Sequence, residues 1–340
     1  MASSAKPGSN LITRMSPALR WRLLFLTIGN LLLVGYLFAY TLRHPDTSFW
    51  KELSQFPAGA APLLLAGLGL TGIIYSGGID LSVGSMIVVS GTVFGIAIER
   101  GHAPGVCFAA CSLVAVFLSC FNGWLIRFSG IPAIIVTLGM LKFYRGFAVL
   151  LAQWHDPDFN GQLTIPLDAE VSYRAPGVEW AGWILLAGVA IALMWEAYGK
   201  QPRLWLAMGN SEEAARLKGL DPDRVKQSAF LAGGFFLGLA ALVYVTKGLT
   251  IEPVRMAATP PFELMVIGAV VLGGTNIFGG EGSYLGTLLG GCLLYFIEKA
   301  ILYAGINPDW RMAIQGMLIL TVISLDCVLH RKHKRMEELR

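Results

Sequence analysis

The sequence predicts an all-α, polytopic integral membrane protein with about ten transmembrane helices. Hydrophobic residues make up 55% of its 340 residues, only 14% are Asp, Glu, Lys or Arg, and the mean hydropathy is +0.61. Ordinary soluble domains carry about 25% charged residues. Because a soluble chain of this size could not bury so much apolar surface, the composition excludes disordered, coiled-coil, collagen-like and disulfide-scaffold proteins.

Each predicted span is an apolar run that can cross a hydrocarbon core of about 30 Å, or that is short enough to need shielding by its neighbours. The runs cover approximately residues 23–42, 60–77, 83–98, 105–126, 131–152, 179–197, 227–247, 262–273, 283–303 and 311–329. The third and eighth runs are short. We therefore expect short or broken helices near 76–85 and 273–283.

The distribution of Lys and Arg sets the expected orientation, because cytoplasmic segments carry an excess of these residues. With the N-terminus inside, the cytoplasmic segments hold sixteen Lys and Arg and the outer segments hold seven. We therefore expect both termini to be cytoplasmic. The expected organisation is a cytoplasmic N-terminal segment at 1–22, a single transmembrane domain at 23–329 with an outer loop at 153–178 and a cytoplasmic loop at 198–226, and a basic cytoplasmic tail at 330–340.

Several other classes of function find no support in the motifs. The basic residues lie in short segments between apolar runs, which argues against nucleic-acid binding despite a net charge of +4. The five cysteines form no CxxC pair and no HExxH pair occurs, so no metal site is expected. The chain has no G-x-x-x-x-G-K-[ST] run to hold ATP, and its hydrophilic stretches are too short for an enzymatic domain.

The segment SGGIDLSVGS at 76–85 places polar and turn-forming residues between two spans, in a linker too short for a solvated loop. Gly77, Gly78 and Gly84 suit a tight turn, and Asp80 and Ser82 are each placed to cap the incoming helix. The alternative is a broken helix end that lines a transport pathway.

A second interruption, VVLGGTNIFGGEGSYLG at 270–286, has the same character. Its turn glycines can adopt conformations closed to other residues, so we expect a tight cytoplasmic turn there. These glycines are Gly273, Gly274, Gly279, Gly280 and Gly282.

The stretch NSEEAARLKGLDPDRVK at 210–226 predicts two short helices on the cytoplasmic surface. Ser211 with the following glutamates makes a helix start, Gly219 a stop, and Asp221 with Pro222 a restart. The stretch is either a solvated amphipathic linker or a lever that docks into a groove of a partner protein.

Ionisable residues inside spans are costly and mark interior or water-filled paths. Lys142, Arg145 and Glu263 are therefore candidate pathway residues. Other ionisable residues, among them Glu196, lie near span ends, where long side chains can reach the interface.

Five segments in order give the chain a family resemblance: SGGIDLSVGS at 76–85, IPAIIVTLGMLKFYRG at 131–146, AMGNSEEAARLKGLDPDRVK at 207–226, AVVLGGTNIFGGEGSYLGTLLG at 269–290 and NPDWRMAIQGMLILTVISLD at 307–326. Over about 55–328 it resembles permease subunits of bacterial ABC sugar importers of the ribose, xylose and arabinose type, within the broader branched-chain amino-acid and ribose permease family.

The resemblance implies a function and a set of partners. Residues 212–219 resemble the E-A-A-x-x-x-G segment whose short helix docks on the ATPase, which implies coupling roles for Glu212, Glu213, Ala214, Ala215, Arg216 and Gly219. The implied partners are a cytoplasmic ABC ATPase that binds ATP, a periplasmic sugar-binding protein and a second permease copy or sister chain in the inner membrane, among membrane lipid. The chain itself would be a transport subunit without enzymatic activity or cofactor, and its substrate a pentose or related sugar.

Other substrates and mechanisms stay open. Amino acids, autoinducer-like sugars and nucleosides are alternative substrates within the ABC class, and an ion-driven secondary transporter is an alternative outside it.

Overall fold

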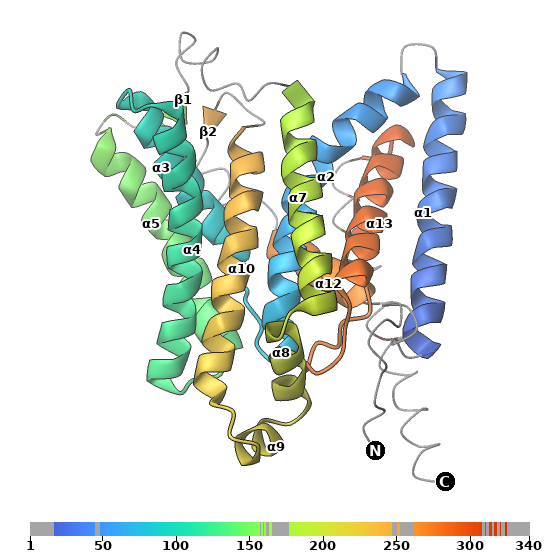
Figure 1. The fold of residues 1–340 in the computed structure, drawn as a ribbon. Helices are drawn as coiled ribbons and strands as arrows, with labels where there is room; N and C mark the ends of the chain where they lie inside the picture. The colour runs from blue at the N-terminus through green and yellow to red at the C-terminus, as the bar shows by residue number, and fades with distance from the viewer. Residues whose placement is uncertain are drawn as a thin grey trace.

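The fold is a bundle of mostly long α-helices, seen in a computed structural model and drawn in Figure 1. The structure describes residues 17–44, 48–156, 163–164, 177–246, 250–251 and 262–307, with single residues at 158, 160 and between 310 and 324. The helices are α1 (Pro17–Arg43), α2 (Phe49–Tyr75), α3 (Val83–Glu99), α4 (Pro104–Ser129), α5 (Ala133–His155), α7 (Gly177–Tyr198), α8 (Gln201–Asn210), α9 (Glu212–Leu217), α10 (Pro222–Val245), α12 (Phe262–Leu272) and α13 (Tyr284–Tyr303).

The expected all-α membrane class is confirmed. Within the described ranges, seven helices are long and apolar enough to cross a membrane, and α3 and α12 are shorter apolar helices, as the sequence predicted. The predicted span at 311–329 lies mostly outside the described residues, as do the N-terminal segment 1–22, the outer loop 153–178 and the tail 330–340. Two short strands, β1 (Leu163–Thr164) and β2 (Thr250–Ile251), form an antiparallel pair.

Helix α2 forms the centre of the bundle. All its residues from Ala60 to Tyr75 are buried, and it packs against α7, α10, α12 and α13. A Cβ on Gly69 would come within 2.7 Å of the Gly233 carbonyl oxygen in α10. Helices in lipid associate mainly through close van der Waals packing. The glycines of the segment GLGLTG, residues 67–72 of α2, therefore allow tight helix contact.

The two ends of the bundle carry different elements. In Figure 1, α9 lies at one end and the β1–β2 pair at the other. The start of α1 lies at the α9 end, where a Cβ on Gly274 would meet the side chains of Leu19 and Arg22. We call this end, with the α4–α5 and α12–α13 connections, the α9 end.

Candidate coupling and translocation sites

The residues between α7 and α10 form the coupling segment, defined as 199–221. Within it, the side chain of Ser211 accepts a hydrogen bond from the Ala214 amide and caps α9. Gly219 ends this turn with a φ of +81°, a left-handed conformation that glycine adopts without strain. The Asp221 carboxylate then caps α10, with Pro222 in its first turn.

One expectation for this stretch was wrong. The restart at Pro222 does not produce a second short surface helix, because α10 continues unbroken from Pro222 to Val245. The second short element is α8, which precedes α9 and which the sequence analysis did not find. The coupling segment is therefore joined directly to a long spanning helix. A displacement of α9 would act on the first turn of α10, at Pro222.

Helix α9 turns one face inward and one outward. Ala215 is 3% exposed, whereas Leu217 is 85% exposed and Glu213 and Ala214 are also exposed. A single exposed apolar side chain is common on protein surfaces, so Leu217 by itself does not mark an interaction surface. Leu217 lies within the resembled segment, although the sequence analysis did not single it out.

Glu212 connects α9 to the start of α10 through two ion pairs. Its carboxylate lies 2.7 Å from Lys226 Nζ and 2.9 Å from Arg216 Nη2. Hydrogen bonds from Lys226 and Arg216 lower the pKa of Glu212. Because Lys226 belongs to α10 and Arg216 to α9, the carboxylate holds the two helices at a fixed angle.

The coupling segment also contacts the two glycine-rich interruptions that the sequence predicted. Asn210 at the end of α8 donates to the Gly280 carbonyl oxygen at 3.0 Å, and the Gly280 amide donates to the Tyr75 carbonyl oxygen at 3.2 Å. A Cβ on Gly279 would lie 2.8 Å from the Gly77 backbone nitrogen. We call this meeting point of Tyr75, Gly77, Asn210, Gly279 and Gly280 the glycine junction.

At 76–85, the structure corrects the expected caps. Asp80 does not cap α3: its Oδ1 accepts from the Ser82 amide at 2.8 Å and from the Ser82 hydroxyl at 2.6 Å. Ser82 occupies the N-cap position, but its side chain accepts no hydrogen bond from the first turn. Gly78 packs against Ile73 instead of carrying a positive φ.

Asp80 and Ser82 belong to a buried polar network that joins α3, α4 and α5. Asn122 in α4 donates to the Ser82 hydroxyl at 2.8 Å, and the Tyr144 hydroxyl in α5 donates to Asn122 Oδ1, also at 2.8 Å. All four residues are almost completely buried. The sequence analysis missed Asn122 and Tyr144, because nothing local shows which polar residues of two spanning helices turn toward each other.

The glycines of the 270–286 interruption match the expected turns only in part. Gly274, Gly279 and Gly280 have positive φ, and Gly282 packs closely against Tyr75 and Thr275. Gly273 has no positive φ; it lies in contact with the Gly286 backbone, where a side chain would not fit.

Two of the three candidate pathway residues meet. Arg145 Nη2 in α5 lies 3.0 Å from Glu263 Oε1 and 3.3 Å from Oε2 at the start of α12. Glu263 is 1% exposed and Arg145 is 16% exposed. Gly84 makes room for the carboxylate, because a Cβ there would lie 2.9 Å from Glu263 Oε1. A buried pair of this kind connects two helices that are far apart in sequence.

Lys142, the third candidate, does not join this pair. It lies one turn before Arg145 on α5, on a face that is exposed together with Leu138, Gly139 and Gly146. A charged side chain exposed at the middle of a spanning helix is costly in lipid. The position therefore suits contact with another protein chain or with a water-filled path.

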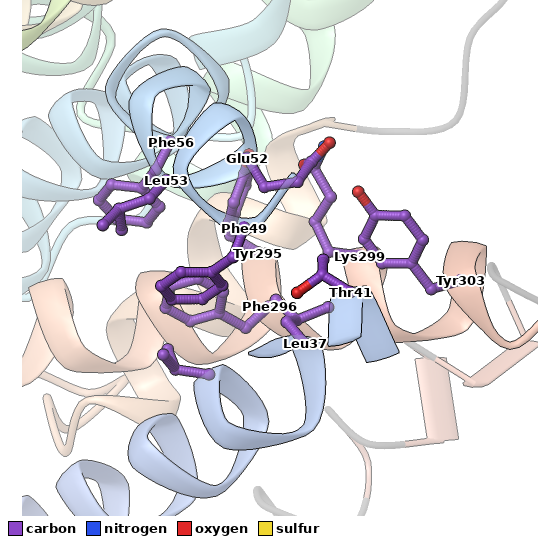
Figure 2. A pocket seen from close by; sticks show the side chains of 11 residues that line it. Leu37, Thr41, Phe49, Glu52, Leu53, Phe56, Tyr295, Phe296, Lys299 and Tyr303 are labelled. Carbon is purple, nitrogen blue, oxygen red and sulfur yellow. The ribbon is translucent and has the colours of Figure 1, made fainter. Parts of the chain in front are cut away.

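A groove lies at the end of the bundle opposite α9, between α1, α2 and α13 (Figure 2). Phe56 and Phe296 stack with ring centroids 5.3 Å apart, and Glu52 pairs with Lys299 at 3.0 Å. The two charges neutralise each other, and the aromatic rings fill the contact. The groove therefore joins the ends of these three helices that lie opposite α9.

Comparison with known proteins identifies the family. The family described as "Branched-chain amino acid transport system / permease component" matches residues 53–323. The chain belongs to this permease family. The permease is also 30% identical over 298 residues to the autoinducer 2 import system permease protein LsrC of Escherichia coli (strain K12 / DH10B), covering 85% of this chain and 84% of the relative. It is 28% identical over 302 residues to LsrC of Salmonella paratyphi B, with 85% and 83% covered.

The family resemblance stated from the five segments is thus confirmed. The permease is a transport subunit of an ABC importer and not an enzyme, and it is a multi-pass protein of the inner membrane. The roles assigned to individual residues stay predictions.

Proposed function

We propose that the permease forms the transmembrane path of an ATP-driven importer for a sugar-type substrate. The observation that carries this proposal is the coupling segment. Its helix α9 projects Glu213 and Leu217 from the bundle, while α8 is anchored at the glycine junction to the ends of spanning helices. A solvated linker would not need this anchor.

The proposed orientation places the α9 end in the cytoplasm, with both chain termini on that side. Among the described residues, this end carries the basic side chains of the α1 start, of Arg127 and of the coupling segment. The positive-inside rule assigns such an end to the cytoplasm.

Three protein partners follow from this arrangement. A cytoplasmic ABC ATPase would bind the exposed face of α9 and carry the ATP, since this chain has no phosphate-binding loop. A periplasmic binding protein would deliver the substrate at the opposite end. A second permease copy or a sister chain would cover the exposed α5 face that carries Lys142.

The transport path is proposed to run along α5. A second chain on the face of Lys142 would place this lysine and the partly exposed Arg145 beside a shared interior. Arg145 would then hydrogen-bond passing hydroxyl groups, while its ion pair with Glu263 holds α5 against α12.

The mechanism follows from linkage between two states. ATP binding in the partner would move α9, and the glycine junction would pass this displacement to the end of α2. A loaded binding protein would favour one state through its differential contacts. The permease itself then needs only weak affinity for the substrate.

The substrate class rests on the relatives. The similar proteins are named for import of autoinducer 2, and the five resembled segments indicate the ribose type. The family description names branched-chain amino acids, which are therefore the second candidate class. Uptake of ribose, xylose, arabinose, autoinducer 2 and leucine by vesicles with the reconstituted importer would distinguish these classes.

The proposal is tested by co-purification with the ATPase encoded beside this chain. The wild type is expected to recover the ATPase and to stimulate its hydrolysis, whereas the double variant Glu213→Lys, Gly219→Pro should insert into the membrane but lose both signals. Lys51→Glu, an exposed charge reversal at the opposite end, is the matched control. A wild type that recruits no ATPase, or a double variant that behaves like it, would favour ion-driven transport instead.

A further inference from the structure

Glu196 occupies a position that its place near a span end did not predict. It lies in the last turn of α7, which ends at Tyr198, and α8 begins at Gln201. Its side chain does not extend to the interface. Instead, Oε1 accepts two hydrogen bonds, and Oε2 is shielded from solvent and has no hydrogen-bond partner among the described residues.

A single carboxylate oxygen of Glu196 joins three helix ends. It accepts from the Tyr75 hydroxyl at 3.1 Å and from the Tyr284 backbone amide at 3.2 Å. Tyr75 is the last residue of α2 and Tyr284 the first of α13. The two tyrosine rings are buried and pack edge to face with centroids 5.5 Å apart.

The carboxylate also suits the start of α13 electrostatically. The first amides of a helix have no partner within it, and the helix dipole favours negative charge there. The Ser283 hydroxyl accepts from the Gly286 amide, and Glu196, from a different helix, accepts from the Tyr284 amide. The start of α13 therefore depends on α7 for one of its acceptors.

The residues around Glu196 touch the coupling segment on two sides. Its neighbour Trp195 packs against Trp205 of α8 at 5.3 Å between ring centroids, and Trp205 Nε1 donates to the Ser228 hydroxyl of α10 at 2.8 Å. The Tyr75 backbone carbonyl, in turn, contacts Gly209 and accepts from the Gly280 amide.

We propose that Glu196 is a positioning residue of the coupling mechanism: its shared oxygen makes the ends of α2, α7 and α13 move as one body with the coupling segment. This inference rests on the proposed function. Without the oxygen, α9 still docks on the ATPase, but its displacement is no longer passed to the start of α13. Since the acceptor oxygen makes both bonds, a glutamine, which keeps an amide oxygen, preserves the link.

Hydrogen-exchange mass spectrometry tests this on the complex of the full chain with its ATPase. Exchange is measured at the coupling segment and at residues 284–290, with ADP and after trapping with ATP and vanadate. In the wild type, trapping alters exchange in both regions. In Glu196→Ala, opening at the start of α13 increases by about tenfold or more with ADP, and its response to trapping is lost. The response of the coupling segment and the ATPase activity stay.

Three further variants keep the test decisive even where Glu196→Ala is poorly folded. Glu196→Gln should respond like the wild type, Tyr75→Phe should loosen the α2 link while the bond to Tyr284 stays, and Glu52→Ala should alter exchange only at the opposite end. A wild-type response in Glu196→Ala, or a lost response in Glu196→Gln, overturns the inference. A wild-type chain that binds no ATPase overturns the proposed function itself.

Discussion

Removing the guanidinium of Arg145 should lower the free energy of unfolding, because it leaves the buried Glu263 carboxylate without its cation. The carboxylate of Glu263 is 1% exposed, and Arg145 Nη2 lies within 3.3 Å of both its oxygens. Breaking a buried pair by removing one partner costs about 3–5 kcal/mol, because it leaves an uncompensated charge. Since Arg145 is 16% exposed, we expect the lower end of that range, about 3 kcal/mol, for Arg145→Met.

The partner substitutions separate this effect from a loss of packing. Glu263→Gln should cost less than Arg145→Met, because the amide oxygen still accepts from Arg145 and the cation can turn to its exposed side. The double variant Arg145→Met, Glu263→Met should recover most of the loss, since apolar replacements of a buried pair are often neutral. Leu138→Met, an apolar exchange at an exposed position of the same helix, is the matched control and should change stability by less than about 0.5 kcal/mol.

Reversible unfolding of the reconstituted permease, followed by the fluorescence of its tryptophans, would give these free energies as a double-mutant cycle. If the double variant were as unstable as Arg145→Met, the loss would come from packing and not from an unpaired carboxylate. The electrostatic account of this pair would then be wrong.

Three further predictions concern the coupling segment and the buried network. Gly280→Ala should cost about 1–2 kcal/mol of unfolding free energy, because φ is +81° and the new Cβ would lie 2.7 Å from Asn210 Oδ1. A variant as stable as the wild type would contradict the close packing described at the glycine junction. Asn122→Leu should cost about 1–3 kcal/mol in the same assay, because the buried Tyr144 hydroxyl loses its 2.8 Å acceptor. Because the pKa of Glu212 is lowered on folding, its contact with α10 is intact above the ordinary carboxylate pKa of about 4.3 and is lost as the pH falls through the lower folded value. Hydrogen exchange in α9 should rise there, and Glu212→Gln should abolish that pH dependence.

Local sequence chemistry was sufficient to predict α9, the turn at Gly219 and most spans, but not α8. Ser211, Gly219 and Asp221 act on neighbours only two to four residues away, so their effect is visible without a tertiary structure. The short apolar helices α3 and α12 were also predictable, because each is an apolar run with a glycine-rich turn at one end. The same local argument failed at Asp80, whose side chain could reach either the helix amides or Ser82.

Long-range partners were not predictable in this way. The sequence nominated Arg145 and Glu263 separately, yet they are 118 residues apart along the chain, and nothing local indicates that they pair. It also placed Lys142 with them, although this lysine is exposed on α5 and does not join the pair of Arg145 and Glu263. In a helix that is apolar on every side, hydrophobic periodicity does not show which face turns inward.

The sequence by itself determined that this chain spans a membrane many times, where its helices break, and that a short charged helix projects at one end. These features depend on run length, on glycine and on capping residues, which act locally. Only the tertiary structure decided that Glu196, Tyr75 and Tyr284 share one contact, and that Asp80, Asn122 and Tyr144 form one network. Such contacts depend on how each helix is rotated about its axis, which is set by close packing with its neighbours and not by the residues of that helix alone.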